Sequence, residues 1–257
     1  MARSTVPSFC IVIPAFDAAP MLLNVLIELF EEFPDLNAKS VIVIDDGSSD
    51  STSQVAKTGG ADVVRHTKNL GKGAAILTGL REAKARGFTS MLIVDADGQH
   101  PAASARLVLE TGDVHTLVLG IRDLVRDGAP KMNQFSNGIS NYFISHFGKR
   151  KLGDTQCGLR RYPVDETLAL GAHANGYAFE AEVLLLAMAT QMPIIQVPIE
   201  VRYPPENERV THFDSVRDPM RIIGVVVRTL WALRGNAAST SAQQKAELRA
   251  GVQKNGE

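Results

Sequence analysis

The stretch Met91–Pro101 has the sequence MLIVDADGQHP, in which an apolar run changes abruptly to polar residues. The apolar residues predict a buried strand, and the polar ones predict the loop that follows it. In an α/β sheet, ligands bind beyond the carboxyl ends of the strands, so we expect Asp95 and Asp97 at the rim of a binding site. Carboxylates are preferred ligands of Mg²⁺ and similar cations, and the glycine after them permits a turn that brings in Gln99 or His100 as a further ligand.

The Asp-x-Asp pattern alone has a second interpretation. It also describes a helix N-cap with a spare surface carboxylate, because Pro101 suits the first turn of a helix. The choice between the two depends on which residues follow the other strands of the sheet.

The length and composition of the chain predict one large globular domain. Its 257 residues are 45% hydrophobic, which is enough apolar material for a substantial core. Acidic and basic residues nearly cancel, with a formal net charge of −1, so no overall field indicates a nucleic-acid partner.

The cysteines and the apolar runs indicate a cytoplasmic protein. Cys10 lies in an apolar segment and Cys157 in a polar one, and such a pair suits reduced thiols better than a disulfide framework. No apolar signal sequence precedes Cys10. The longest apolar run, Ile222–Leu233, is interrupted by Arg228 and is shorter than the roughly 20 residues that span a bilayer, so no membrane crossing is expected.

Strands and helices are expected to alternate through the first half of the chain. Each short apolar run is followed by a loop and then by a segment with helical spacing of apolar residues. Strands are expected at 9–14, 40–44, 62–65, 90–94 and 115–120, with helices at 20–33, 51–57, 74–86 and 101–111. This order predicts an α/β fold with a mostly parallel central sheet flanked by helices.

The second half of the chain is less regular. Residues 121–130 form a charged loop without periodicity, which suits a mobile flap. Helices are expected at 131–147, 179–190 and about 215–234, a loop at 154–158 and a strand at 193–201. We expect a single domain over residues 1–235 that ends in an amphipathic helix, followed by a polar, mobile tail at 236–257.

Acidic residues follow more than one strand of the expected sheet. The strands that end at Pro14, at Asp45–Asp46 and at Asp95–Asp97 are adjacent in a parallel sheet, so their loops face one crevice. Carboxylates gathered there repel one another unless a cation neutralises them or they accept hydrogen bonds from a sugar or a base. A nucleotide diphosphate satisfies both conditions. The cluster therefore favours a metal site over an N-cap for the Asp-x-Asp pattern.

The segment Asn69–Gly73, with the sequence NLGKG, narrows the class of ligand further. It offers backbone N–H groups and the Lys72 ammonium to a phosphate or to an acidic neighbour. It lacks the spacing of a P-loop, which disfavours a nucleotide kinase. No Gly-x-Gly-x-x-Gly follows the first strand, which counts against a dinucleotide-binding dehydrogenase.

Four segments resemble, in order, the motif series of the family 2 glycosyltransferases. They are Val12–Asp17, Val43–Asp50, Asn69–Gly73 and Asp95–His100, with the sequences VIPAFD, VIDDGSSD, NLGKG and DADGQH. The chain is most similar to the dolichol-phosphate and polyprenyl-phosphate sugar synthases, over about residues 9–203. The resemblance implies the GT-A nucleotide-diphospho-sugar transferase fold. It also implies metal-dependent sugar transfer, with inversion, from a nucleotide-diphosphate sugar to a dolichyl-type or undecaprenyl-type phosphate.

The resemblance and the positions of the motifs give a set of candidate site residues. The first two segments would contact the base and ribose of a UDP- or GDP-sugar, and the last would hold the diphosphate with Mg²⁺ or Mn²⁺. The expected metal ligands are Asp95, Asp97 and Gln99. The candidate donor-binding residues are Pro14, Phe16, Asp17, Asp45, Asp46, Ser48, Lys72, Asp95, Ala96, Asp97, Gln99, Arg202 and His212.

Some of these candidates have alternative roles. Asp45 or Asp46 can instead cap the helix that follows, a role that is also open to Ser48 or Asp50. His212 shares a loop with Arg209, which suits contact with a phosphate on closure, although a surface histidine without function is the alternative.

Three acidic residues are candidates for catalysis: Asp97, Asp154 and Glu180. The loop Asp154–Gly158 resembles the acceptor-site motif of the family, in which a carboxylate takes the proton of the attacking group, and Glu180 competes for that role or orients it. A phosphate acceptor is already ionised near neutral pH and needs such a base only weakly, whereas a hydroxyl acceptor needs it strongly. The alternatives are a soluble glycosyltransferase with a hydroxyl acceptor and a nucleotide-sugar-binding module without turnover.

Two amphipathic segments, Lys131–Lys151 and Ser215–Arg234, carry apolar stripes beside basic residues. They are too short to span a bilayer, but such segments can lie at the headgroup boundary of an anionic leaflet. The sequence therefore predicts peripheral contact with the cytoplasmic face of a membrane. Packing of both stripes into the core is the alternative.

Overall fold

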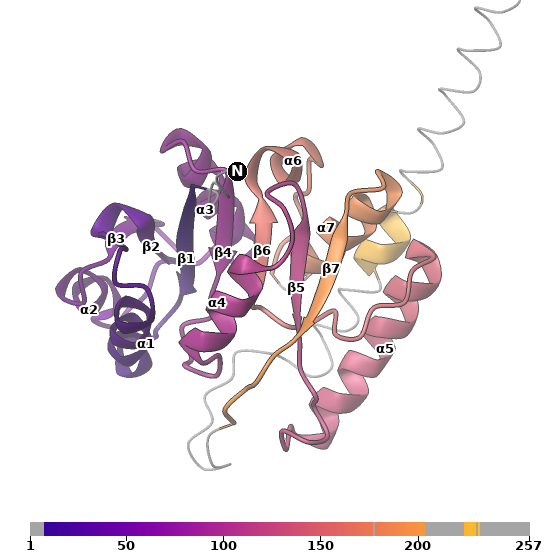
Figure 1. Ribbon diagram of the computed structural model, residues 1–257, viewed down its shortest axis with the longest axis horizontal. Coiled ribbons are helices and arrows are strands. Elements are labelled where there is room, and N and C mark those ends of the chain that lie inside the picture. The colour runs from indigo at the N-terminus through magenta and orange to yellow at the C-terminus, as the bar shows by residue number, and fades with distance from the viewer. Residues whose placement is uncertain (1–7, 177, 204–223, 230, 232–257) are drawn as a thin grey trace, which may run out of the picture.

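The computed structural model describes residues 8–176, 178–203, 224–229 and 231, and Figure 1 shows their arrangement around a central sheet. The described residues form one seven-stranded sheet with the order β3-β2-β1-β4-β6-β5-β7. The strands are β1 Phe9–Ala15, β2 Val41–Asp45, β3 Asp62–Arg65, β4 Ser90–Ile93, β5 Leu117–Ile121, β6 Arg160–Pro163 and β7 Ile194–Pro198. All neighbouring pairs are parallel except those that β6 makes with β4 and β5.

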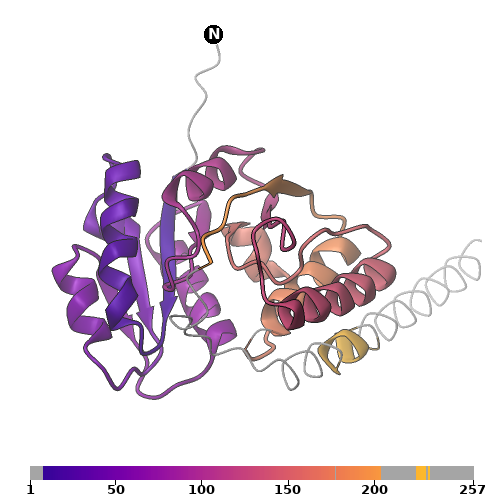
Figure 2. The same cartoon turned by 90° about the horizontal axis from the view of Figure 1, so that it is seen from below.

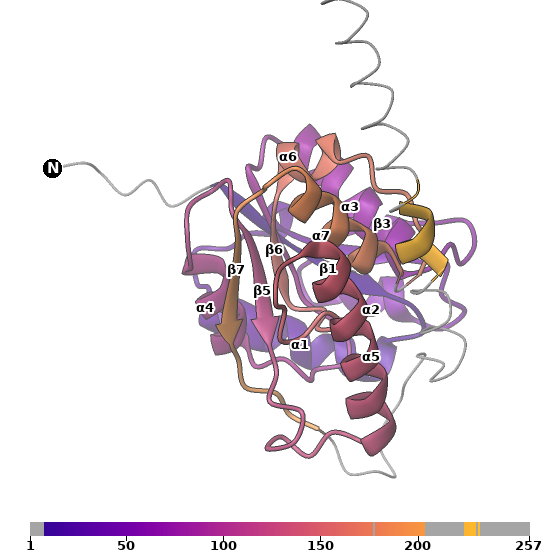
Figure 3. The same cartoon turned by 90° about the vertical axis from the view of Figure 1, so that its right-hand side faces the viewer.

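Helices cover both faces of this sheet (Figure 2). They are α1 Ala19–Glu32, α2 Thr52–Thr58, α3 Lys72–Ala85, α4 Ala102–Glu110, α5 Lys131–Gly148, α6 Val164–Ala169 and α7 Ala178–Ala189, with a short 3₁₀ turn η1 at Ala38–Ser40. On one face, α1 and α4 bury residues such as Leu26 and Val108, and on the other α3 and α7 bury Ile76 and Leu184. Figure 3, seen from the β7 edge, shows α5 running beside α7.

The predicted fold class is confirmed, because a mostly parallel sheet lies between helices on its two faces. The expected neighbourhood of the three motif strands is also confirmed, since β1 lies between β2 and β4. Their shared direction brings the residues after Ala15, Asp45 and Ile93 to one edge of the sheet.

Two elements were not anticipated from the sequence. Strand β6 enters the sheet antiparallel between β4 and β5, and the short helix α6 follows it directly. Because β6 runs against its neighbours, the loop that precedes it reaches the same edge as the loops that follow the parallel strands. The strand expected at 193–201 is shorter than predicted and ends at Pro198.

Several predictions fall outside the described residues. They concern His212, most of the helix at 215–234 and the tail at 236–257, of which only residues 224–229 and 231 are described here. Among the described helices, none is long and apolar enough to cross a membrane.

Candidate functional site

The centre of the candidate site is the Asp95 carboxylate, two residues beyond the end of β4. Its Oδ1 lies 2.7 Å from Nζ of Lys72, the first residue of α3. The same ammonium lies 3.5 Å from Oε1 of Glu180, which is buried in the first turn of α7. Three elements that are distant in the sequence therefore place one cation between two carboxylates.

Charge and burial act differently on the two aspartates of the Asp-x-Asp pattern. Burial alone would raise the pKa of Asp95, but the Lys72 charge holds that pKa below its ordinary value. Burial and the neighbouring Asp95 charge raise the pKa of Asp97 to about 6. The second carboxylate is therefore short of positive charge at neutral pH, which is the condition that a divalent cation relieves.

His100 adds a neutral nitrogen beside these carboxylates. Burial lowers the pKa of His100 to about 4, so its ring is uncharged near neutral pH and does not compete with Lys72 as the counter-ion of Asp95. Its Nδ1 is buried and has no hydrogen-bond partner among the described residues. His100 and Asp97 line one cavity of about 270 Å³.

The donor set around Asp97 suits a cation that is also bound by its substrate. Within the described part of the chain, no group of three or more His, Cys, Asp or Glu side chains is placed to hold a metal ion by itself. Mg²⁺ is commonly held by one or two carboxylates together with substrate phosphates. The two aspartates fit that pattern.

The loop at 154–158 approaches the same carboxylate from the other side. A Cβ atom placed on Gly158 would lie 2.1 Å from Oδ2 of Asp95, so any larger residue would require the Asp95 side chain to move. The loop before β6 therefore contacts the loop after β4.

Asp154 itself is bound on all sides. Its Oδ2 accepts from Nε of Arg122 at 2.7 Å, and its Oδ1 accepts from Nη2 of the same residue at 3.1 Å. The backbone N–H groups of Gln156 and Cys157 also donate to Oδ1. Burial would raise the pKa of Asp154, but Arg122 and these donors hold it low. The contacts favour an anchoring role over the predicted role of proton acceptor.

The loops after β1 and β2 are bound to each other. Oδ1 of Asp17, whose φ is 47°, accepts from the backbone N–H of Ser49 at 2.7 Å, and Oγ of Ser48 accepts from the N–H of Asp17 at 3.0 Å. Asp45 is fully buried, where its carboxylate accepts from the Ser48 N–H and from the Ser53 hydroxyl. Asp45 therefore stabilises the loop through buried hydrogen bonds and is not exposed to the crevice.

The remaining candidates lie around these groups. Pro14 and Phe16 are half-buried at the end of β1, and Ala96 is buried between the two aspartates. The Gln99 carbonyl accepts from the backbone N–H of Arg202 at 2.8 Å. The guanidinium of Arg202 instead reaches Glu28 on α1, at 2.6 Å, although it lines the same 270 Å³ cavity as Asp97.

A second cavity, of about 600 Å³, was not predicted. It lies between the 121–126 segment and α5 and is lined by Arg122, Arg126, Gln134, Asn137 and Asn141, among others. Nε and Nη2 of Arg122 bind Asp154, which leaves Nη1 outside that pair. In the sequence, only the charged loop at 121–130 pointed to a polar site here. The polar residues that face this loop belong to α5, which was interpreted from its apolar stripe.

Comparison with known proteins agrees with this geometry. Residues 10–164 match the family described as Glycosyl transferase family 2. The undecaprenyl-phosphate mannosyltransferase of Micrococcus luteus is 28% identical over 201 residues, which cover 73% of this chain and 81% of that protein. The UDP-N-acetylglucosamine–dolichyl-phosphate N-acetylglucosaminyltransferase of Methanococcus voltae is 26% identical over 218 residues, covering 75% of this chain and 85% of that protein.

Among solved structures, the fold is similar to that of glucosyl-3-phosphoglycerate synthase from Mycobacterium tuberculosis in complex with Mn²⁺, uridine diphosphate and phosphoglyceric acid. The two structures superpose with a TM-score of 0.66 at 18% identity, over 87% of this chain and 78% of the other. That likeness concerns the fold. Since the family match spans more than half of the chain, this protein belongs to glycosyltransferase family 2 and is a glycosyltransferase with a GT-A-like fold.

Proposed function

We propose that this enzyme transfers a sugar from a UDP- or GDP-sugar to a polyprenyl phosphate by a single displacement with inversion, and that it requires Mg²⁺ or Mn²⁺. The observation that carries the proposal is the cluster of Asp95, Asp97 and Lys72 at the edge where β1, β2 and β4 end. This is where an α/β sheet binds its ligands, and the cluster has the charges that a diphosphate and its cation need.

The residues of the cluster have separate roles in this proposal. Asp95 and Asp97, with the Gln99 side chain, would hold the cation, which when bound supplies Lewis-acid stabilisation to the leaving diphosphate. Lys72 keeps Asp95 ionised and presents a second positive charge to the same phosphates. The loops joined by Asp17 and Ser48 would orient the nucleoside, so that much of the rate enhancement comes from positioning.

The acceptor is inferred from the engagement of Asp154 and Glu180, the two candidates for the base that are not assigned to the cation. Both oxygens of Asp154 are engaged by Arg122, and Glu180 is buried against Lys72. A hydroxyl acceptor would need one of these carboxylates to take its proton, whereas a phosphate acceptor is already an anion. The two relatives named above as transferases to dolichyl and undecaprenyl phosphates support the same choice.

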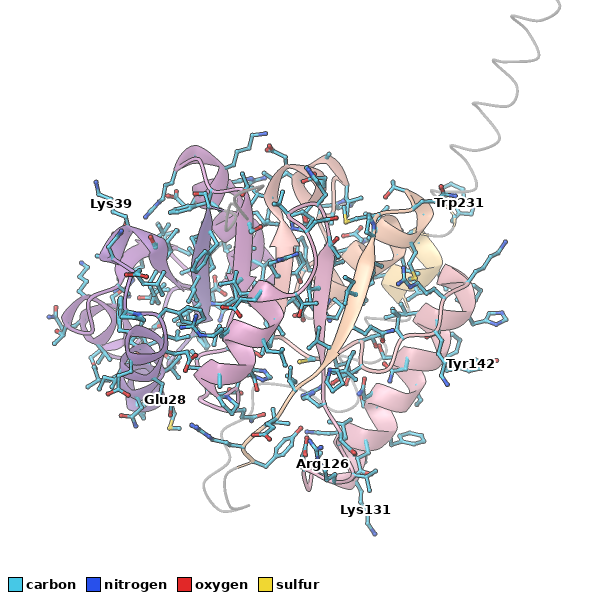
Figure 4. All side chains as sticks on the ribbon, viewed as in Figure 1. Glu28, Lys39, Arg126, Lys131, Tyr142 and Trp231 are labelled. Carbon is cyan, nitrogen blue, oxygen red and sulfur yellow. The ribbon has the colours of Figure 1, made fainter. Side chains whose placement is uncertain are left out.

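The surface beside the 600 Å³ cavity supports a lipid-linked acceptor. On α5, Phe135 is 66% exposed and Tyr142 is 65% exposed, and Figure 4 shows Tyr142, Lys131 and Arg126 projecting outward on that side. Trp231 is 80% exposed in the short C-terminal helical segment. Exposed aromatic and basic side chains suit the headgroup region of an anionic membrane, which supports peripheral membrane contact along α5.

The proposal is tested by mass-spectrometric detection of released UDP or GDP. The protein is given candidate nucleotide sugars with Mg²⁺, Mn²⁺ or EDTA, and with polyprenyl phosphate, the unphosphorylated polyprenol or no acceptor. We expect release only with cation and polyprenyl phosphate together, and a product whose anomeric configuration is opposite to that of the donor. Equal release with polyprenol would instead support a hydroxyl acceptor, and nucleotide binding without release would support a binding module.

A further inference from the structure

A partly buried chain of three side chains connects the residue after β2 with helix α3. Nδ1 of His66 lies 2.6 Å from Oδ1 of Asp46, and Nε2 of His66 lies 2.9 Å from the hydroxyl oxygen of Thr78. The side chains of His66 and Asp46 are 10% and 5% exposed. We call Asp46, His66 and Thr78 the Asp46 clasp. None of its members belongs to the Lys72–Asp95–Glu180 cluster.

The clasp has a defined direction of hydrogen bonding. The two oxygens of Asp46 also accept the backbone N–H groups of Leu70 and Gly71, at 2.9 and 2.7 Å. Asp46 is therefore the acceptor toward all three neighbours, and His66 donates through Nδ1. In the neutral ring, Nε2 is then an acceptor, so the Thr78 hydroxyl donates to it. The Asp46 carboxylate thus requires the proton on Nδ1, and the Thr78 hydroxyl provides a partner for the other ring nitrogen.

The two N–H groups that Asp46 binds lie directly before the first residue of α3. Gly71 is the N-cap residue of this helix, has φ 93° and has no side chain that could cap it. The Asp46 carboxylate supplies from β2 an acceptor that the segment itself lacks. The loops also touch through their backbones, because a Cβ on Gly47 would lie 2.5 Å from the carbonyl carbon of Lys68.

We propose that His66 and Thr78 are positioning residues that act through Asp46 to fix the Leu70–Lys72 backbone and thereby hold the Lys72 ammonium against Asp95. The contacts run without a gap from Thr78 to Asp46, from Asp46 to the N–H of Gly71, and from the next residue to Asp95. The consequence for donor binding rests on the proposed function, in which Lys72 meets the donor diphosphate. Asp46 thus organises the donor site through the backbone, beyond the direct base or ribose contact expected from the sequence.

The first test measures the clasp without using activity. Hydrogen exchange of the Leu70 and Gly71 amides is compared in wild type, His66→Leu, Thr78→Val and Thr78→Ser. The matched control is Thr111→Val at the C-cap of α4, where the hydroxyl donates to the backbone carbonyl of Leu107. Loss of a hydrogen bond to a charged group corresponds to about a tenfold change in equilibrium, so we expect about tenfold faster exchange in His66→Leu and a smaller increase in Thr78→Val. Thr78→Ser keeps the hydroxyl and should match wild type.

The second test measures donor binding in the same variants. We expect the KM for the donor, and the calorimetric Kd for UDP or GDP with Mn²⁺, to rise about tenfold in His66→Leu, while the acceptor KM stays unchanged. A merely structural role would lower the melting temperature and the active fraction, and therefore kcat, without moving the donor KM. If Thr78→Ser keeps the wild-type donor KM while Thr78→Val does not, the effect comes from the loss of the hydroxyl and not from the changed shape of the side chain.

The outcomes are distinguishable. Unchanged amide exchange, or unchanged nucleotide affinity, in a folded His66→Leu protein would overturn the positioning role, and Thr78→Val serves the same purpose if His66→Leu does not fold. If wild type binds neither UDP nor GDP with Mn²⁺ or Mg²⁺ while the amides respond as expected, the proposed function fails and the link from the clasp to donor binding fails with it. Faster exchange together with weaker donor binding, both reversed in Thr78→Ser, supports the proposal.

Discussion

The two halves of the sheet edge differ in how firmly their side chains are held. On the β2-β1-β4 side, Asp45, Asp46 and Asp95 are each bound by residues of neighbouring loops or helices. On the β5-β7 side, the edge opens into a cavity of about 600 Å³, and Val125 and Phe135 beside it are exposed. A pre-organised site suits one small, charged ligand, whereas an open and partly apolar one suits a larger, variable ligand. The difference supports a donor on the first side and an acceptor on the second.

The largest effect is expected from the donor side. Asp97→Asn should lower kcat/KM by about 100- to 1,000-fold, because it removes a charge that would hold the cation at the leaving group. The fold should persist, since Asp97 lies in a rim loop. Asp165→Asn is the control, because Asp165 is an exposed carboxylate whose partner, Lys84, is also on the surface. If Asp97→Asn turns over within a few-fold of wild type, Asp97 is not a ligand of the cation.

The next effect concerns the boundary between the halves, where Arg122 and Asp154 form a buried ion pair. Arg122→Leu leaves the carboxylate buried without its partner and should lower the free energy of unfolding by about 3 to 5 kcal/mol in urea titrations. The exposed pair of Arg126 with Asp127 is the control, since Arg126→Leu should cost less than about 1 kcal/mol. Similar losses in both variants would contradict the buried role of Arg122.

The same pair predicts a pH dependence. The folded pKa of Asp154 lies below its unfolded value, so the pair stabilises the fold fully above pH about 4 and loses this contribution as the pH falls through the folded pKa. In acid titrations monitored by circular dichroism, the stability difference between wild type and Arg122→Leu should therefore shrink at low pH. A difference that is constant down to the acid transition would show that the ion pair is not its source.

A smaller effect is expected for the exposed surface of α5. Phe135→Ser should weaken co-sedimentation with anionic vesicles by about tenfold, because it removes one aromatic anchor from the interface. Leu107→Ser on α4 removes another exposed apolar side chain, 47% exposed, away from α5 and should leave vesicle binding unchanged. Wild-type protein that stays in the supernatant at low salt would transfer support to a hydroxyl acceptor.

The smallest effects compare one substitution in the two halves. Gly158→Ala places a methyl group against Asp95 and should weaken nucleotide binding several-fold in calorimetry. Gly138→Ala, in the middle of α5, meets nothing within 4 Å and should stabilise the protein by about 0.5 to 1 kcal/mol. If both variants bind nucleotide as tightly as wild type, the close approach of Gly158 to Asp95 does not require glycine.

The sequence was most informative where its signal is local. An apolar run followed by acidic residues located the ends of β2 and β4, because the change in polarity reports the passage from the buried sheet to its rim. The same reasoning missed β6, whose sequence RRYP is polar. Arg160 and Arg161 are nevertheless buried, since their guanidinium groups bind backbone carbonyls such as those of Cys157 and Leu109. Such partners cannot be identified from the strand alone.

The candidate site shows the same limit. Asp95 and Lys72 were identified from their motifs, and the structure places them 2.7 Å apart. His66 was overlooked because it follows a short strand and belongs to no recognisable spacing. Its proposed positioning role rests on contacts with Asp46 and Thr78, which come from two other parts of the chain. Asp154 was predicted as a site residue from its loop motif, whereas its engagement by Arg122 depends on a contact across 32 positions of sequence.

The antiparallel strand β6 also bears on the order in which the protein folds. The described strands β3, β2, β1 and β4 come from the first 93 residues, and in the described sheet they join the later strands only through the ladder between Ser90–Ile93 and Arg160–Pro163. Ladders between such distant segments form late, because a long chain must first be closed into a loop. During synthesis, we therefore expect the side of β4 that pairs with β6 to lack a strand partner until β6 has been made. Asp95 and Lys72 belong to the early part and Gly158 and Glu180 to the late one, so a nascent chain completes its donor site only when this last ladder closes.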